Sequence, residues 1–137
     1  MQIKDLRILV VDDNVYKLMS IKRALEYNGV TMITTVNNQE DVFSELAIPG
    51  AHYDVIVTDM QYPLTSGSSV NCDAGYILID RLKEQGKDIP VIICSSDNVS
   101  PGDAIGTVWY NGLRDLEYDM YEQLLYVVSL VDERYGV

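Results

Sequence analysis

The sequence predicts a doubly wound α/β fold, in which five mainly parallel strands form one sheet with helices on both faces. Two observations lead to this prediction. Short apolar runs of strand length alternate five times with other segments, and most of those segments have apolar residues at helical spacing. The runs are also almost continuously apolar, as parallel strands covered on both faces require. At 137 residues the chain fits a single domain, 1–137, with a core of ordinary size.

Five segments are expected to form the strands, namely residues 7–11, 31–36, 54–59, 90–95 and 107–110. The second is the most polar of them, which indicates a position at an edge of the sheet. Alternating strands and helices predict parallel pairing. Right-handed crossovers then leave few possible strand orders.

Four segments have the spacing of helices. Asn38, Asp73 and Asp115 are placed to cap the last three of them. The stretch 97–104 contains proline and glycine, so any helix there is short or irregular. The helix residues expected to face the core are Leu18, Ile21, Leu25, Val42, Leu46, Leu78, Ile79, Leu82, Leu116, Met120, Leu124, Val127 and Val131.

The charge of the chain limits its partners. Ten basic residues against twenty-one acidic ones give a formal net charge of −11, which repels nucleic acid phosphates, and no basic patch offsets it. Nucleic acid is therefore not an expected partner. No run approaches the ~20 apolar residues that span a bilayer, and the first residues lack the apolar stretch of a secretion signal. We expect a cytoplasmic protein without membrane insertion.

The cysteines and the histidine do not indicate a catalytic or zinc site. Two cysteines are too few for a four-ligand zinc site, and a disulfide scaffold is unusual in a chain of this size without a signal. Cys94 lies in an apolar run and is expected to be a buried thiol, whereas Cys72 lies in a polar stretch and is expected to be exposed. The single histidine, His52, is expected to lie at the surface.

Acidic residues follow two of the apolar strands. The first strand is followed by Asp12 and Asp13, and the third ends in Asp59. In a doubly wound sheet, ligands bind outside the carboxyl ends of the strands, where the strand order reverses. In the order 2-1-3-4-5 this point lies between the first and third strands, which are neighbours about 4.8 Å apart. The three acids are therefore expected to share one small cleft.

Three carboxylates in one cleft favour a bound cation, because each raises the pKa of the others. Mg²⁺ is a hard dication that takes one or two carboxylates together with waters and phosphate oxygens. The spacing therefore indicates a Mg²⁺ site that is ready to accept phosphate. A single strand-end acid would instead be interpreted as a helix cap, and the three together favour the site. Ser95 ends the fourth strand beside this cleft, where its hydroxyl can donate to a phosphoryl oxygen. A serine at a strand end more often forms a local hydrogen bond in a turn.

Three segments resemble the CheY-like receiver domains of the bacterial two-component response-regulator family, which have a flavodoxin-like fold with the strand order 2-1-3-4-5. Residues 8–14 hold the acid pair, residues 55–63 place a proline four positions after Asp59, and residues 90–95 end in Ser95. In this order the resemblance extends over essentially the whole chain.

The resemblance implies that Asp59 is a phosphoacceptor. Its phosphoryl group would come from a phosphohistidine on a sensor histidine kinase or from a phosphotransfer protein. The resemblance also implies that Mg²⁺ is held directly by Asp13, by Asp59 and by the backbone carbonyl of Gln61. Asp12 would hold the ion largely through water.

Further roles follow from the same resemblance. Ser95 would contact the phosphoryl group and move toward it on activation. Gln61 and Asp97 occupy the two positions whose side chains influence the lifetime of the acyl phosphate in the family. Because both are polar and able to orient a water molecule, we expect a short-lived phosphoryl state.

The sequence departs from the family pattern in two places. Receivers usually carry a lysine at the end of the fifth strand, but here Asn111 follows that strand and no lysine occurs after Lys87. Arg114 is close in sequence but would reach the cleft only if the loop folds over it. The second departure is the long segment after the phosphoacceptor, with a polar loop at 64–72. Trp109, in the fifth strand, is expected to lie in the core.

Three functions stay open at this point. The first is a stand-alone receiver that accepts phosphate on Asp59 and signals through protein–protein contacts. The second is a pseudo-receiver, an interaction module independent of phosphorylation, which the missing lysine favours and the intact acids and Ser95 oppose. The third and least favoured is a Mg²⁺-dependent phosphatase of the haloacid-dehalogenase type. Its aspartate nucleophile lies on the first strand, two residues from a second acid, and Asp12 and Asp13 lack that spacing.

Overall fold

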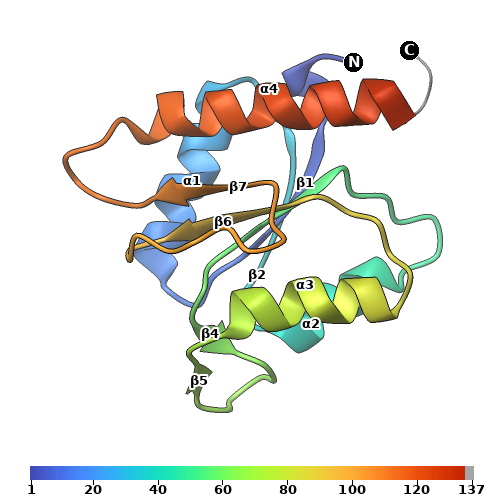
Figure 1. Ribbon diagram of the computed structural model, residues 1–137, viewed down its shortest axis with the longest axis vertical. Helices are drawn as coiled ribbons and strands as arrows, with labels where there is room; N and C mark the ends of the chain where they lie inside the picture. Colours follow the sequence, from blue (N-terminus) through green and yellow to red (C-terminus); the bar gives the residue numbers. More distant parts are fainter. Residues whose placement is uncertain (135–137) are drawn as a thin grey trace.

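Five apolar segments pair as parallel strands of one sheet in the computed structural model, which describes residues 1–134 (Figure 1). The strand order is β2-β1-β3-β6-β7, so the predicted flavodoxin-like order is confirmed. β2 lies at an edge, as its polar sequence indicates. The bounds are β1 Arg7–Val11, β2 Met32–Val36, β3 Val55–Thr58, β6 Val91–Ser95 and β7 Gly106–Trp109.

The register of β1 against β3 brings the strand-end acids together. Val11 is paired with Thr58, so the next residue of each strand, Asp12 and Asp59, leaves the sheet at the same edge. The backbone N–H of Asp59 donates to the carbonyl of Val11 at 2.9 Å, which continues the ladder by one residue. The acids are thus placed by main-chain pairing, before any side-chain contact is formed.

Helices cover both faces of the sheet. α1 (Val15–Tyr27) and α4 (Leu116–Arg134) lie on one face, and α2 (Gln39–Leu46) and α3 (Ala74–Glu84) lie on the other (Figure 1). A short 3₁₀ turn, η1 (Ile3–Asp5), precedes β1. Residues of β1 alternate between the two layers: Ile8 and Val10 pack with α1 and α4, whereas Leu9 and Val11 pack with α2 and α3. This alternation is the period-two pattern of a strand buried on both faces.

Most helix residues predicted for the core are fully buried, and Leu18, Leu46 and Leu116 are partly buried. The two cysteines are free, with Cys94 buried and Cys72 exposed as predicted. In the described residues 1–134, none of the helices combines the length and the apolar character needed to cross a membrane.

The predicted caps differ in how they act. Asn38 and Asp115 each accept a backbone N–H from three residues further on. Asp73 occupies the N-cap position of α3, but its side chain makes no capping hydrogen bond. Asn14 caps α1 by accepting the backbone N–H of Lys17 at 3.1 Å. This bond closes the first turn of α1, which follows Asp12 and Asp13 in the sequence.

Two segments differ from the sequence expectations. The stretch between β6 and β7 contains no helix, so even a short fourth helix does not form there. Gly102 has a φ of +55°, which does not continue a right-handed helix. The long loop after Asp59 is partly ordered as a hairpin, because β4 (Tyr62–Pro63) pairs antiparallel with β5 (Val70–Asn71). In Figure 1 this hairpin lies beside the first turn of α3.

The expected core position of Trp109 is wrong. Its side chain is exposed, and its indole N–H donates to the carbonyl of Ser96 at 3.0 Å. The preceding residue, Val108, is 2% exposed and fills the core instead. Side chains alternate between the two faces of a strand, and the run of three apolar or aromatic residues at 108–110 does not reveal which of them face the core.

Candidate functional site

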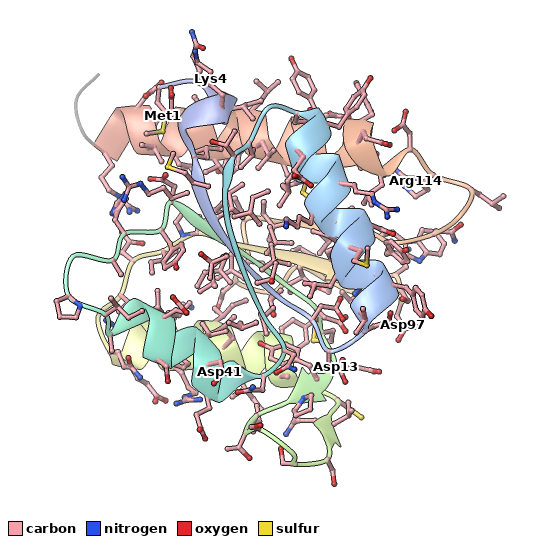
Figure 2. All side chains as sticks on the ribbon, turned by 180° about the vertical axis from the view of Figure 1, so that it is seen from behind. Met1, Lys4, Asp13, Asp41, Asp97 and Arg114 are labelled. Atoms are coloured by element: carbon pink, nitrogen blue, oxygen red, sulfur yellow. The ribbon has the colours of Figure 1, made fainter. Side chains whose placement is uncertain are left out.

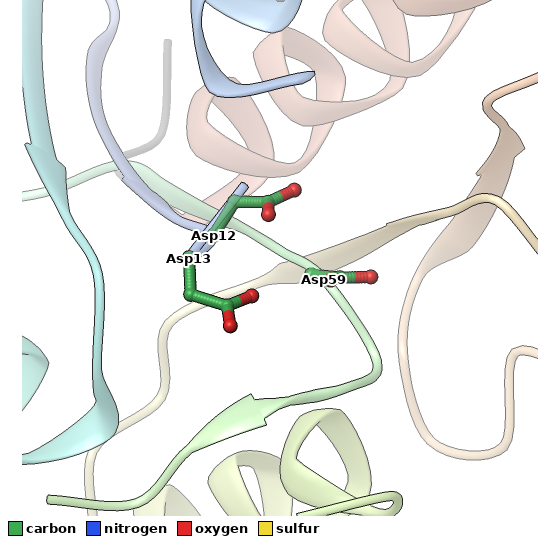
Figure 3. A group of neighbouring side chains, drawn as sticks. All are labelled: Asp12, Asp13 and Asp59. Carbon is green, nitrogen blue, oxygen red and sulfur yellow. The ribbon is translucent and has the colours of Figure 1, made fainter. Parts of the chain in front are cut away.

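Three carboxylates gather at the carboxyl ends of β1 and β3. Asp12, Asp13 and Asp59 each place one carboxylate oxygen within 4.8 Å of the others, and Figure 3 shows the three side chains near one another at the strand ends. Asp12 is 1% exposed, whereas Asp59 is partly buried and Asp13 is exposed. The three strand-end acids therefore lie together as expected, with Asp12 buried and Asp13 exposed.

Lys17, which was not predicted from the sequence as a site residue, lies among these carboxylates. The Nζ of Lys17 lies 2.8 Å from Asp12 Oδ2 and 2.9 Å from Asp59 Oδ1. It also donates a hydrogen bond to the carbonyl of Cys94 at 2.7 Å. The side chain is 4% exposed, so a positive charge is buried between two of the three acids.

The burial of Lys17 could have been predicted from its spacing in the sequence. Lys17 lies four residues before Ile21 and eight before Leu25, which places it on the apolar stripe of α1 that faces the sheet. A lysine on such a stripe is rarely buried unless it is paired. Since the strand-end acids are the nearest predicted carboxylates, this pattern would have indicated an ion pair with them.

Burial and ion pairing act in opposite directions on the pKa of Asp12 and on that of Lys17. Burial raises the pKa of Asp12, and the neighbouring Lys17 lowers it by less, so the net shift is upward. For Lys17, burial lowers the pKa, but the charges of Asp12 and Asp59 raise it by more, so the lysine is held in its charged form. Within the described residues Asp12 Oδ2 accepts no well-directed hydrogen bond, although Lys17 lies 2.8 Å away. Their contact is therefore best described as a buried ion pair.

The backbone around Asp59 is held from two sides. The N–H of Met60 donates to Asp59 Oδ1 at 2.7 Å, and the N–H of Gly75 at the start of α3 donates to the carbonyl of Met60 at 3.0 Å. A Cβ on Gly75 would lie 2.9 Å from the backbone oxygen of Asp59. Glycine is required here because α3 approaches the strand end too closely for a side chain.

Ser95 lies where the sequence analysis expected it, at the end of β6. It is 3% exposed, and its Oγ accepts the backbone N–H of Asp97 at 3.1 Å. Its hydroxyl proton is therefore still available as a donor. Asp97 and Gln61 are both exposed, at the rim of this end of the sheet.

The residues near the usual lysine position do not supply a charge to the cleft. Asn111 uses its side-chain oxygen to accept the backbone N–H of Leu113 at 2.9 Å, as in a local turn. Arg114 pairs with Asp119 at the start of α4, with Nε 2.8 Å from Oδ2. Figure 2 shows Arg114 well separated from Asp13.

Tyr110, directly after β7, covers the lysine. The centre of its ring lies 5.8 Å from the Nζ of Lys17, a separation at which a cation is attracted to an aromatic face. Its hydroxyl donates to Ser20 Oγ on α1 at 3.1 Å, and its backbone N–H donates to the carbonyl of Ser95 at 2.8 Å. Tyr110 therefore ties the end of β7 to both α1 and β6.

Comparison with known families identifies the fold and the family. The family model for the response regulator receiver domain matches residues 8–106. This range runs from β1 to the start of β7 and includes all three acids. The chain belongs to this family. Receiver domains are signalling domains rather than classical enzymes, and the resemblance found in the sequence is confirmed. A comparison with curated protein sequences gave no match.

Solved receiver structures share this fold. The chemotaxis response regulator CheY4 of Vibrio cholerae is 18% identical with a TM-score of 0.65, covering 89% of this chain and 98% of its own. The receiver domain of the Francisella response regulator 1452 is 20% identical with a TM-score of 0.68, covering 93% and 99%. The response regulator TrrA of Thermotoga maritima, in complex with Mg²⁺ and BeF, is 23% identical with a TM-score of 0.65, covering 90% and 99%. At these identities the likeness establishes the architecture and leaves the site to be argued from its own residues.

Proposed function

We propose that the protein is a phosphorylation-dependent signalling receiver in which Asp59 accepts a phosphoryl group with the help of Mg²⁺. The observation that carries this proposal is the convergence of Asp12, Asp13 and Asp59 at the strand ends. The donor would be a phosphohistidine on a sensor histidine kinase or a phosphotransfer protein, met in the cytoplasm. The output would be a change in contacts with another protein.

The residues present fit a magnesium ion. Three carboxylates and the ammonium of Lys17 have formal charges of −3 and +1, so the cluster is at −2 and one dication neutralises it. The buried Asp12 Oδ2 accepts no well-directed hydrogen bond from the described residues and is paired with Lys17 alone, and a carboxylate oxygen is of the kind that Mg²⁺ prefers. Asp13, Asp59 and the backbone carbonyl of Gln61 would hold the ion directly, and Asp12 through water. When bound, Mg²⁺ neutralises charge on the phosphoryl oxygens during transfer.

Asp59 has a free oxygen for the reaction. Its Oδ1 is occupied by the N–H of Met60 and by Lys17, so Oδ2 is the oxygen that attacks phosphorus. The new bond is Oδ2–P, and the bond that breaks joins phosphorus to the donor, whose leaving atom takes the electron pair. With acetyl phosphate the leaving group is acetate. Hydrolysis reverses the state: a water oxygen attacks phosphorus and the Asp59 carboxylate leaves.

Four further residues have proposed roles around the phosphoryl group. The hydroxyl of Ser95 would donate to a phosphoryl oxygen, since its proton is not used by the Asp97 contact. Asn111 would contribute a neutral amide N–H in place of a charge. The exposed side chains of Gln61 and Asp97 would orient the attacking water and so shorten the lifetime of the acyl phosphate.

Mass spectrometry after incubation with Mg²⁺ and acetyl phosphate tests the proposal. We expect a mass gain of one phosphate in the wild-type chain and none in Asp59→Asn. Asp80→Asn, a matched change at an exposed position of α3, should be phosphorylated normally. If neither acetyl phosphate nor a phosphohistidine donor adds phosphate to the wild-type chain, the receiver would be one that signals without phosphorylation.

The pseudo-receiver alternative rested on the missing strand-end lysine. Lys17 supplies a buried cation at the same cluster, within 2.9 Å of Asp59 Oδ1. The absence of a lysine after β7 is therefore no longer an argument against phosphorylation.

A further inference from the structure

Lys17 is held by a complete set of contacts. An ammonium has three N–H donors, and three oxygens surround this one: Asp12 Oδ2, Asp59 Oδ1 and the carbonyl of Cys94, at 2.8, 2.9 and 2.7 Å. The side chain starts from the first turn of α1, which the Asn14 cap fixes in place. Its direction toward the strand ends is therefore set by the backbone and does not depend on a flexible loop.

Asp12 Oδ2 and the Cys94 carbonyl take no part in the reaction. The charge on the third oxygen, Asp59 Oδ1, changes when Asp59 is phosphorylated. Before reaction, Asp59 Oδ1 shares the negative charge of a carboxylate. After Oδ2 has bonded to phosphorus, Oδ1 is the neutral carbonyl oxygen of an acyl phosphate, and about two negative charges lie on the phosphoryl oxygens one bond further out. Phosphorylation therefore weakens the attraction between Nζ and Oδ1 and places more strongly charged phosphoryl oxygens next to Nζ.

We propose that Lys17 is the phosphoryl-binding cation of this receiver, supplied by α1 in place of the end of β7. The inference rests on the proposed phosphoacceptor role of Asp59. In the phosphorylated state Nζ leaves Oδ1 and donates to a phosphoryl oxygen, keeping its bond to the Cys94 carbonyl. Among the described residues Lys17 is the cation that contacts Asp59, and Arg114 is engaged with Asp119.

A simpler role would be that Lys17 only neutralises buried Asp12 and keeps the cleft in shape. The two roles predict opposite effects on Mg²⁺. If Lys17 binds phosphate, Lys17→Met removes a positive charge that repels the metal from shared carboxylates, so Mg²⁺ binding tightens while phosphoryl binding weakens. If Lys17 only shapes the cleft, both affinities fall together.

Calorimetric titration with Mg²⁺, and then with BeF₃⁻ in the presence of Mg²⁺, separates these cases, because BeF₃⁻ is a phosphomimetic. In Lys17→Met we expect Mg²⁺ to bind about tenfold more tightly. BeF₃⁻ should bind about 10- to 100-fold more weakly, which corresponds to one charge-assisted hydrogen bond. Lys17→Arg keeps the charge and should recover part of the BeF₃⁻ affinity. Lys22→Met, at an exposed position of the same helix, should change neither constant.

Equal BeF₃⁻ affinity in Lys17→Met and wild type, or a parallel loss of both affinities, overturns the inference. A wild-type chain that binds no BeF₃⁻ and gains no phosphate overturns the phosphoacceptor role itself, and this one with it. Should Lys17→Met fail to fold, a crystal structure of the wild-type chain with Mg²⁺ and BeF₃⁻ decides. We expect Nζ within about 3 Å of a fluorine; an Nζ that stays on Asp12 and Cys94 without a fluorine contact contradicts the proposal.

Discussion

Replacing Lys17 by methionine is expected to lower the free energy of unfolding by about 3–5 kcal/mol at neutral pH without Mg²⁺. The size follows from the two charge pairs at 2.8 and 2.9 Å. At an effective dielectric constant of about 20, each is worth roughly 6 kcal/mol. Desolvation of a buried ammonium offsets several kcal/mol of this sum. What is left without the lysine is Asp12, a carboxylate with a fully buried side chain and no counterion.

Thermal unfolding followed by circular dichroism measures this loss. For a chain of this size about 4 °C of melting temperature corresponds to 1 kcal/mol, so a decrease of roughly 12–20 °C is expected. The exposed Lys22→Met variant should stay within about 0.5 kcal/mol of wild type. Mg²⁺ should restore part of the loss in Lys17→Met, because the dication binds the native carboxylates and replaces the missing charge. A decrease below about 1 kcal/mol in Lys17→Met without Mg²⁺ would refute the reasoning, since a buried, unpaired Asp12 should cost more than that.

Three more outcomes are expected. Gly75→Ala, whose Cβ would lie 2.9 Å from the backbone oxygen of Asp59, should lower stability by about 1–3 kcal/mol and slow phosphorylation by acetyl phosphate; unchanged urea unfolding would contradict the close approach. Burial raises the pKa of Cys94 to about 12, so below that pH the native thiol is protonated. At pH near 8 a thiol-specific reagent should therefore modify Cys72 alone until the chain is unfolded, and rapid reaction of both thiols would show that the core is open. The indole of Trp109 is exposed, so acrylamide should quench its fluorescence in the native state, whereas resistance to quenching would place it in the core.

The sheet could be predicted from the sequence because its signals are redundant. Each strand is a short apolar run, and the alternation with helices leaves few parallel orders. The acids at the strand ends then follow from the order alone, since β1 and β3 are neighbours and the pairing of Val11 with Thr58 brings Asp12 and Asp59 to one edge.

The unpredicted features depend on contacts that a one-dimensional pattern does not encode. Lys17 occupies a position that would ordinarily be apolar, and only the position of α1 over the strand ends makes a charge there favourable. The β4–β5 hairpin consists of two residue pairs, too short for a periodic signal. Trp109 is exposed and Val108 is buried, because three successive apolar or aromatic residues do not indicate which of them face inward.

Because Lys17 lies on α1, all the charged side chains of the cluster come from one part of the chain. Every charged side chain of the cluster lies between Asp12 and Asp59, in the first half of the 137 residues. From the second half, the Cys94 carbonyl, the Ser95 hydroxyl and the ring of Tyr110 are neutral, and the charged side chain of Asp97 is exposed at the rim. Substitutions on the outer surface of β7 and α4 therefore leave the charge of this cluster as it is. The charges of the cluster are therefore encoded in the first half of the sequence, whereas the proposed phosphoryl contacts of Ser95 and Asn111 come from the second half.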